Sequence, residues 1–147
     1  MQQIETEITI HAAPETVWRV LSGFDQYPAW NPFITSISGE QRPGAKLTVR
    51  IQPPGSGGMT FKPTVLAFTA PTEFRWKGKL FLPGLFDGEH YFRLEKTGDN
   101  TTRFVHGEKF SGILVSLLGG MLDKTKEGFA LMNDALKKEC EESTGNI

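Results

Sequence analysis

The chain has 147 residues, a length that suits one folded domain with a sizeable buried core. Sixteen Lys and Arg residues against seventeen Asp and Glu give a formal net charge of -1, with no basic tract that would indicate binding to nucleic acid. The single cysteine, Cys140, excludes an internal disulfide framework and a cysteine-based metal cluster. No run reaches the roughly 20 apolar residues that span a bilayer, and the start lacks signal-peptide features. We therefore expect a cytoplasmic protein without stable membrane insertion.

The first elements are a strand and two short helices. Residues 3–11 alternate apolar and polar side chains, which is typical of a half-buried strand. Pro14 and Glu15 then suit the first turn of a helix, and Gly23 suits its end. We expect a second short helical segment at residues 24–27, before Pro28.

The middle of the chain is strand-like. Pro63 indicates an edge position or a bulge in its strand, and residues 98–100 have the composition of a hairpin turn. We expect strands near residues 33–38, 47–51, 61–65, 74–77, 86–96 and 101–110.

The last segment changes period. Apolar residues recur every three or four positions from Leu114 to Leu136, which predicts one long amphipathic helix. The order of elements indicates an α+β fold in which a curved antiparallel sheet of about seven strands wraps around this helix. We expect a single domain over residues 1–147.

The hairpin of residues 86–110 brings polar side chains to an apolar face. The residue types favour the pairs Leu94/Phe104, Phe92/His106 and His90/Glu108, with all of these side chains on the concave side of the sheet. Three interpretations remain open for His90, His106 and Glu108. They hydrogen-bond one another or water near a pocket mouth, they orient a ligand, or they act as an acid/base pair in catalysis.

Three segments together resemble a known superfamily. They are residues 8–18 (ITIHAAPETVW), 27–33 (YPAWNPF) and 103–112 (RFVHGEKFSG). The chain resembles the SRPBCC or START-like superfamily, in its polyketide cyclase/dehydrase and lipid-transport branch. The resemblance implies a helix-grip fold with a cavity between the sheet and the long helix. It also implies an apolar ligand such as a lipid or polyketide, while a minority of members are enzymes. It brings no shared catalytic motif.

We therefore predict a protein that binds or carries a small hydrophobic molecule, as a monomer or loose homodimer, with no cofactor and no metal. The predicted lining is Phe61, Val65, Trp76, His90, Phe92, Phe104, His106, Glu108, Phe110, Leu118, Leu122 and Phe129. One alternative is a polyketide cyclase- or dehydratase-like enzyme that uses His90, His106 and Glu108. The other is a protein-interaction module in which aromatic side chains fill the cavity.

Overall fold

The computed structural model describes residues 2–80, 86–112 and 119–145. Its elements run in the order β1 (Gln2–Ile10), α1 (Pro14–Ser22), the 3-10 helix η1 (Phe24–Gln26), α2 (Tyr27–Trp30), β2 (Ile34–Ser38), β3 (Thr48–Ile51), β4 (Met59–Phe61), β5 (Thr64–Thr69), β6 (Glu73–Leu80), β7 (Phe86–Gly98), β8 (Thr101–Ser111) and α3 (Gly119–Gly145).

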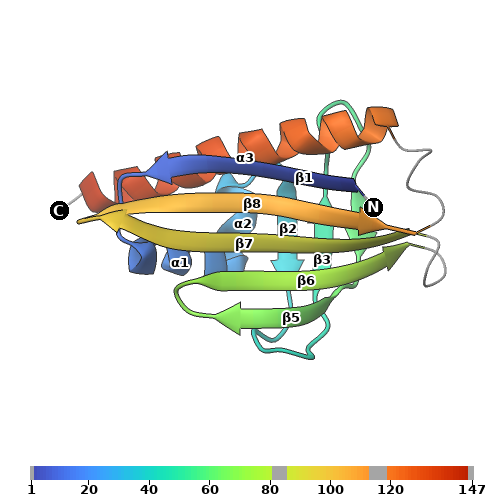
Figure 1. The fold of residues 1–147 in the computed structure, drawn as a ribbon, viewed down its shortest axis with the longest axis horizontal. Coiled ribbons are helices and arrows are strands. Elements are labelled where there is room, and N and C mark those ends of the chain that lie inside the picture. Colours follow the sequence, from blue (N-terminus) through green and yellow to red (C-terminus); the bar gives the residue numbers. More distant parts are fainter. Residues whose placement is uncertain (1, 81–85, 113–118, 146–147) are drawn as a thin grey trace.

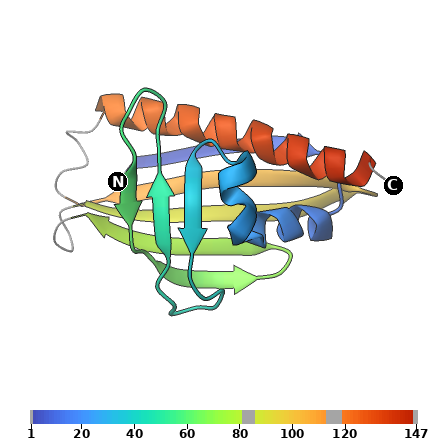
Figure 2. The same cartoon turned by 180° about the vertical axis from the view of Figure 1, so that it is seen from behind.

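The strands form two antiparallel sheets. The larger has five strands in the order β1-β8-β7-β6-β5, and the smaller has three in the order β2-β3-β4. Figure 2 shows the smaller sheet and the short helices on one face of the larger sheet, while α3 runs along its β1 edge. Figure 1 shows the opposite face of the larger sheet, which these elements leave uncovered. The predicted α+β helix-grip fold is confirmed.

The N-terminal elements follow the local sequence. Helix α1 has Pro14 in its first turn and Gly23 as its C-cap, and it buries Val17 and Leu21. The predicted second helical segment is divided into η1 and α2. The Tyr27 hydroxyl ties α2 to α1 by donating to the Leu21 carbonyl at 2.5 Å.

One strand prediction was wrong. Residues 61–65 do not form a single strand, because the chain leaves the smaller sheet after Phe61 and enters the larger sheet at Thr64. Pro63 lies at this break, since it has no backbone N–H for a sheet ladder. The two segments raise the number of strands to eight in the described part of the chain, against about seven predicted.

The hairpin register was predicted correctly. Strands β7 and β8 pair Leu94 with Phe104, Phe92 with His106 and His90 with Glu108. Together with β6 they form rows across the inner face of the larger sheet, one of which is Trp76–His90–Glu108.

Helix α3 closes the core from one side. Its buried residues Phe129, Met132, Leu136 and Cys140 recur at helical spacing. The prediction began this helix at Leu114, but residues 113–118 lie outside the described residues. Near its other end, Lys137 donates to the Thr9 carbonyl at 2.8 Å, which holds α3 against β1.

Candidate functional site

A pocket of about 250 Å³ lies between the two sheets, beside α3. Most of the side chains that line it are apolar. The described lining residues are Phe33, Val49, Ile51, Pro53, Ser56, Gly57, Met59, Phe61, Pro63, Trp76, Gly78, Lys79, Gly88, Glu108, Phe110 and Thr125.

Two paired glycines on the inner face of the larger sheet provide the space. Gly78 of β6 lies directly opposite Gly88 of β7, in the row next to Trp76 and His90. Neither glycine has a side chain to fill the gap between the sheets. A Cβ atom on Gly88 would lie 2.4 Å from Glu108 Oε2, so the glycine also makes room for this carboxyl group. The hollow is therefore encoded by two small residues at inward-facing strand positions.

Glu108 connects the pocket to a buried histidine. Its side chain is 16% exposed, and Oε1 lies 3.4 Å from Nδ1 of the fully buried His90. This is an ion-pair distance rather than a well-formed hydrogen bond, and Nδ1 has no hydrogen-bond partner among the described residues. The His90 ring stacks on Trp76, with the two ring centroids 4.7 Å apart.

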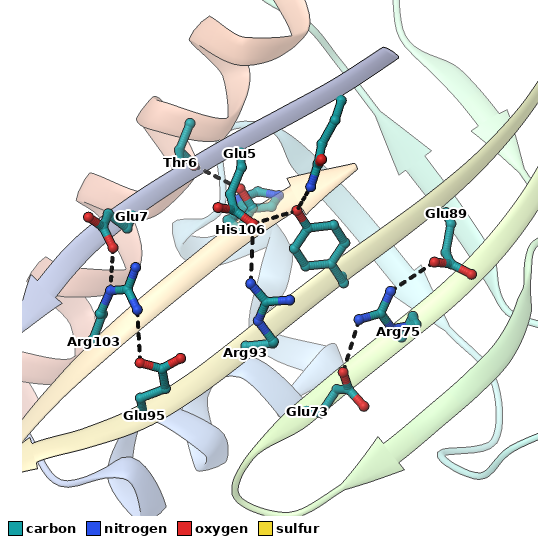
Figure 3. A network of polar contacts seen from close by, with 12 residues as sticks. Glu5, Thr6, Glu7, Glu73, Arg75, Glu89, Arg93, Glu95, Arg103 and His106 are labelled. Atoms are coloured by element: carbon teal, nitrogen blue, oxygen red, sulfur yellow. Dashed lines mark hydrogen bonds and ion pairs between the residues drawn. The ribbon is translucent and has the colours of Figure 1, made fainter. Parts of the chain in front are cut away.

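A chain of hydrogen bonds continues from His90 into the core. His90 Nε2 lies 2.7 Å from His106 Nε2, and His106 Nδ1 lies 2.9 Å from Asn133 Oδ1 on α3. Asn133 Nδ2 donates to Thr6 Oγ1 at 2.8 Å, and Thr6 Oγ1 donates to the His106 carbonyl at 2.9 Å. Figure 3 shows this last bond between β1 and β8. We call the five residues Thr6, Asn133, His106, His90 and Glu108 the polar relay.

The environment of His106 disfavours its charged form. The ring is completely buried, which holds its pKa well below the ordinary value. The adjacent His90 lowers this pKa further, while the Asn133 hydrogen bond acts in the opposite direction. Phe129 stacks on the same ring at 4.0 Å between centroids. His106 is therefore neutral at physiological pH.

The comparisons identify the family. The sequence model of the family described as "Polyketide cyclase / dehydrase and lipid transport" matches residues 1–146. The chain belongs to this polyketide cyclase/dehydrase and lipid transport family. No curated protein matches it.

Solved structures share the fold of this family member at low sequence identity. A norcoclaurine synthase point mutant from Thalictrum flavum, in complex with a transition state analogue, is 16% identical, with a TM-score of 0.75 over 97% of this chain and 96% of that one. The Zhui aromatase/cyclase from Streptomyces sp. R1128 is 14% identical, with a TM-score of 0.75 over 97% and 95%. A START superfamily protein from Mycobacterium smegmatis is 19% identical, with a TM-score of 0.72 over 95% and 97%. The resemblance noted in the sequence is confirmed.

The residues predicted to line the cavity fall into two groups in this family member. Phe61, Trp76, Glu108 and Phe110 line the pocket. A second group is buried in the core and is not part of the described lining: Val65, His90, Phe92, Phe104, His106 and Phe129. Leu122 is partly buried against the core, and Leu118 lies outside the described residues. The part that these residues play in binding stays a prediction.

Sequence reasoning missed the contribution of β3 and of the loop between β3 and β4. Val49 and Ile51 project from β3 into the pocket, and Ser56 and Gly57 line it from the loop. The alternation of residues 47–51 shows which side chains face inward, but nothing in it shows that they face a hollow. The sequence did not indicate that Asn133 belongs to the relay either, because a single polar residue within an apolar helix stripe forms no recognisable motif.

Two other kinds of feature are absent from the described residues. Within residues 2–80, 86–112 and 119–145, no group of three His, Cys, Asp or Glu side chains could hold a metal ion. No helix in the same ranges is long and apolar enough to cross a bilayer.

Proposed function

We propose that this protein binds a small, largely apolar molecule in the pocket between the two sheets, with Glu108 as its polar anchor. The pocket itself carries the proposal, because its walls are mainly apolar and few polar groups converge on it. Lys79 and Glu108 are the ionisable residues of the described lining, and Lys79 is exposed. This combination is typical of a site that buries a ring and fixes its orientation by one polar contact.

The size of the pocket favours a ligand of one or two rings. Its volume of about 250 Å³ lies just below the roughly 300–1,000 Å³ of pockets for drug-sized ligands. A dry cavity of about 150 Å³ is enough to hold benzene. Among apolar ligands, a two-ring aromatic compound therefore fits better than a sterol. Phe92, Phe104 and Phe129 fill the space beyond the pocket with packed rings.

An acid/base enzyme is the second candidate, and the polar relay favours it. Glu108 faces the pocket while His90 stands behind it, so a proton could pass between the ligand and the relay. The norcoclaurine synthase and the aromatase/cyclase are enzymes on the same fold. In this candidate function, Glu108, His90 and His106 serve a cyclase- or dehydratase-like reaction. An enzyme would lose turnover but keep affinity in a Glu108→Gln variant.

Binding can be tested with ring compounds of increasing size and with a variant that blocks the pocket. Gly57 lines the pocket, and a Cβ atom there would meet nothing within 4 Å, so Gly57→Trp adds bulk without a main-chain clash. Leu131→Trp is the matched control, because Leu131 is 46% exposed on α3 and is not part of the described lining.

Titration calorimetry with 2-naphthol and with estradiol gives the readout. We expect 2-naphthol to bind the wild type and the control variant, and to bind Gly57→Trp at least about tenfold more weakly. We expect estradiol to bind poorly. Equal binding of 2-naphthol to Gly57→Trp, or no binding of any ring compound to the wild type, would overturn the proposal. Native mass spectrometry of the purified protein would show any ligand retained from the cell.

A further inference from the structure

One carbonyl group fixes the direction of the hydrogen bonds at the buried end of the polar relay. The main-chain carbonyl of His106 can only accept, so the single hydroxyl proton of Thr6 is donated to it. Toward Asn133 the Thr6 oxygen must then accept, and the Asn133 NH2 group lies 2.8 Å from it. The Asn133 amide oxygen therefore faces His106 Nδ1 at 2.9 Å, and this nitrogen must carry a proton.

The protonation of His106 also fixes the direction of its hydrogen bond with His90. A neutral His106 with a proton on Nδ1 has a lone pair on Nε2. His90 Nε2 lies 2.7 Å from His106 Nε2, so His90 must be the donor of this bond. The Nδ1 atom of a neutral His90 would then carry a lone pair of its own.

The lone pair on His90 Nδ1 would repel an ionised Glu108. His90 Nδ1 is buried, lies 3.4 Å from Glu108 Oε1, and finds no hydrogen-bond partner in the part of the chain that the structure describes. Two acceptors facing one another in a buried site repel, and one proton between them turns the contact into an attraction. Trp76 and Phe129 pack on the His90 ring, with centroids 4.7 and 5.1 Å away, and limit the approach of water.

We propose that the pocket wall holds one exchangeable proton between His90 Nδ1 and Glu108, and that Asn133 is the positioning residue that directs it there. The proton lies either on the Glu108 carboxyl, which then donates to His90, or on His90, which then pairs with the carboxylate. Both placements have the same total number of protons. The protein needs no cofactor to keep it.

This arrangement defines the polar end of the ligand, an inference that rests on the proposed function. Glu108 Oε2 is not the oxygen nearest His90, and it lies over Gly88 in the pocket wall. With the shared proton between His90 and Oε1, Oε2 is an acceptor. The ligand class that fits is a small ring compound with an O–H or N–H donor, such as a phenol or a naphthol.

The proton can be located by NMR of the unliganded protein, with 15N-labelled histidine and 13C-labelled glutamate, near pH 7. We expect His106 to be protonated on Nδ1 alone, and a proton on either His90 Nδ1 or the Glu108 carboxyl. A bare His90 Nδ1 together with an ionised Glu108 would overturn the proposal, as would a His106 protonated on Nε2 alone. In a Glu108→Gln variant the amide donates to His90 Nδ1, so we expect a neutral His90.

The role of Asn133 has its own pair of variants. Asn133→Leu removes the acceptor for His106 Nδ1, and we expect the His106 tautomer signals to change. Asn133→Asp keeps an acceptor oxygen, and we expect Nδ1 to stay protonated. Identical histidine spectra in wild type and Asn133→Leu would overturn the positioning role. The wild-type spectrum tests the shared proton even if Asn133→Leu does not fold.

A pair of probes tests the ligand class separately. 2-Naphthol and 2-methoxynaphthalene differ at the hydroxyl proton, and we expect 2-naphthol to bind about tenfold more tightly, as for one hydrogen bond. In Glu108→Leu this preference should be lost. Equal affinity of the two probes for the wild type would overturn the donor-bearing class. Binding of neither probe would overturn the proposed function, whereas the NMR result would still decide the placement of the proton.

Discussion

Cys140 lies on the inner face of α3, where its thiol is shielded from solvent. Its side chain is buried, and desolvation raises the pKa of the thiol to about 12. Only the thiolate reacts with alkylating reagents, and at pH 8 its fraction would be about one in ten thousand. The residue therefore belongs to the packing of the core.

We expect the native protein to resist labelling of Cys140. In a reaction with iodoacetamide at about pH 8, followed by intact-mass measurement, the folded chain should stay unmodified while the denatured chain takes up one label. The denatured sample serves as the control for reagent quality. Labelling of the folded protein at the rate of an exposed thiol would show that α3 opens readily at this position.

At the scale of elements, α3 and the segment before β2 are held together by a close approach. A Cβ atom on Gly128 would lie 2.3 Å from Phe33 Cδ1. The Phe33 ring packs on Phe129, with centroids 5.5 Å apart, and it also lines the pocket. The glycine thus lets α3 cover both the core and the pocket wall.

The Gly128→Ala substitution has two opposing effects on stability: it raises helix propensity, and it places a methyl group against the Phe33 ring. Alanine would stabilise the helix by about 1 kcal/mol, whereas forcing a methyl group against a packed ring costs about 1–3 kcal/mol. We expect a net loss of up to about 2 kcal/mol in the free energy of unfolding, measured by urea denaturation. Gly57→Ala is the control, since its Cβ meets nothing within 4 Å. A stabilised Gly128→Ala variant would mean that Phe33 moves freely.

The larger sheet carries a ladder of charged side chains on its outer face (Figure 3). Arg75 lies between Glu73 and Glu89, with hydrogen bonds of 3.0 and 2.8 Å, and its guanidinium lies 4.9 Å from the centre of the Tyr91 ring. Arg103 similarly bridges Glu7 and Glu95. The Arg75–Glu89, Arg103–Glu7 and Arg103–Glu95 pairs cross neighbouring strands and support the register of the sheet, whereas Arg75–Glu73 lies within β6.

The two arginines should differ in their contribution to stability. The Arg75 side chain is 18% exposed and that of Arg103 is 43% exposed, so water screens the Arg103 pairs more strongly. We expect Arg75→Met to lower the free energy of unfolding by about 1–2 kcal/mol and Arg103→Met to lower it by less. Urea denaturation at low and high salt gives both values. An equal loss for the two variants would contradict this ranking.

The sequence predicted the larger sheet better than the smaller one. In β7 and β8, long alternation of apolar and charged residues allows one register, because a shift by one residue would bury Arg93 and Arg103. Strands β4 and β5 are three and six residues long, and their separation at Pro63 depends on which sheet each one joins. That choice is a tertiary effect, so alternation within residues 61–65 could not show it.

At the scale of the whole molecule, the sequence pattern predicts which residues share a face of the sheet, but not where the interior is open. His90, His106 and Glu108 were predicted to share a face, and the structure places them in one relay. The resemblance implied a cavity, but the sequence pattern did not show where the interior is open, because that depends on Gly78 lying opposite Gly88. The packing of Phe129 on His106 also depends on where α3 crosses the sheet. The alternation within a strand predicts which side chains share a face. Predicting a pocket also requires the distance between the layers of the fold.

The polar relay also links the stability of the whole chain to pH. Folding lowers the pKa of His106, mainly through burial, so below about pH 6.5 the unfolded chain binds a proton that the folded chain does not. The stability that His106 contributes is therefore fully present above this pH and is lost as the pH falls. The groups facing His106 are His90 from β7 and the uncharged Asn133 and Thr6, with Glu108 beyond His90.

We expect the free energy of unfolding to fall by about 1.4 kcal/mol per pH unit between about pH 6 and pH 5, as for one proton. This window lies above the range in which most carboxylates titrate. Urea denaturation at half-unit pH steps gives the slope. A flat profile would mean that the folded chain takes up as many protons as the unfolded chain over this range, and would contradict the exclusion of a proton from His106 by burial.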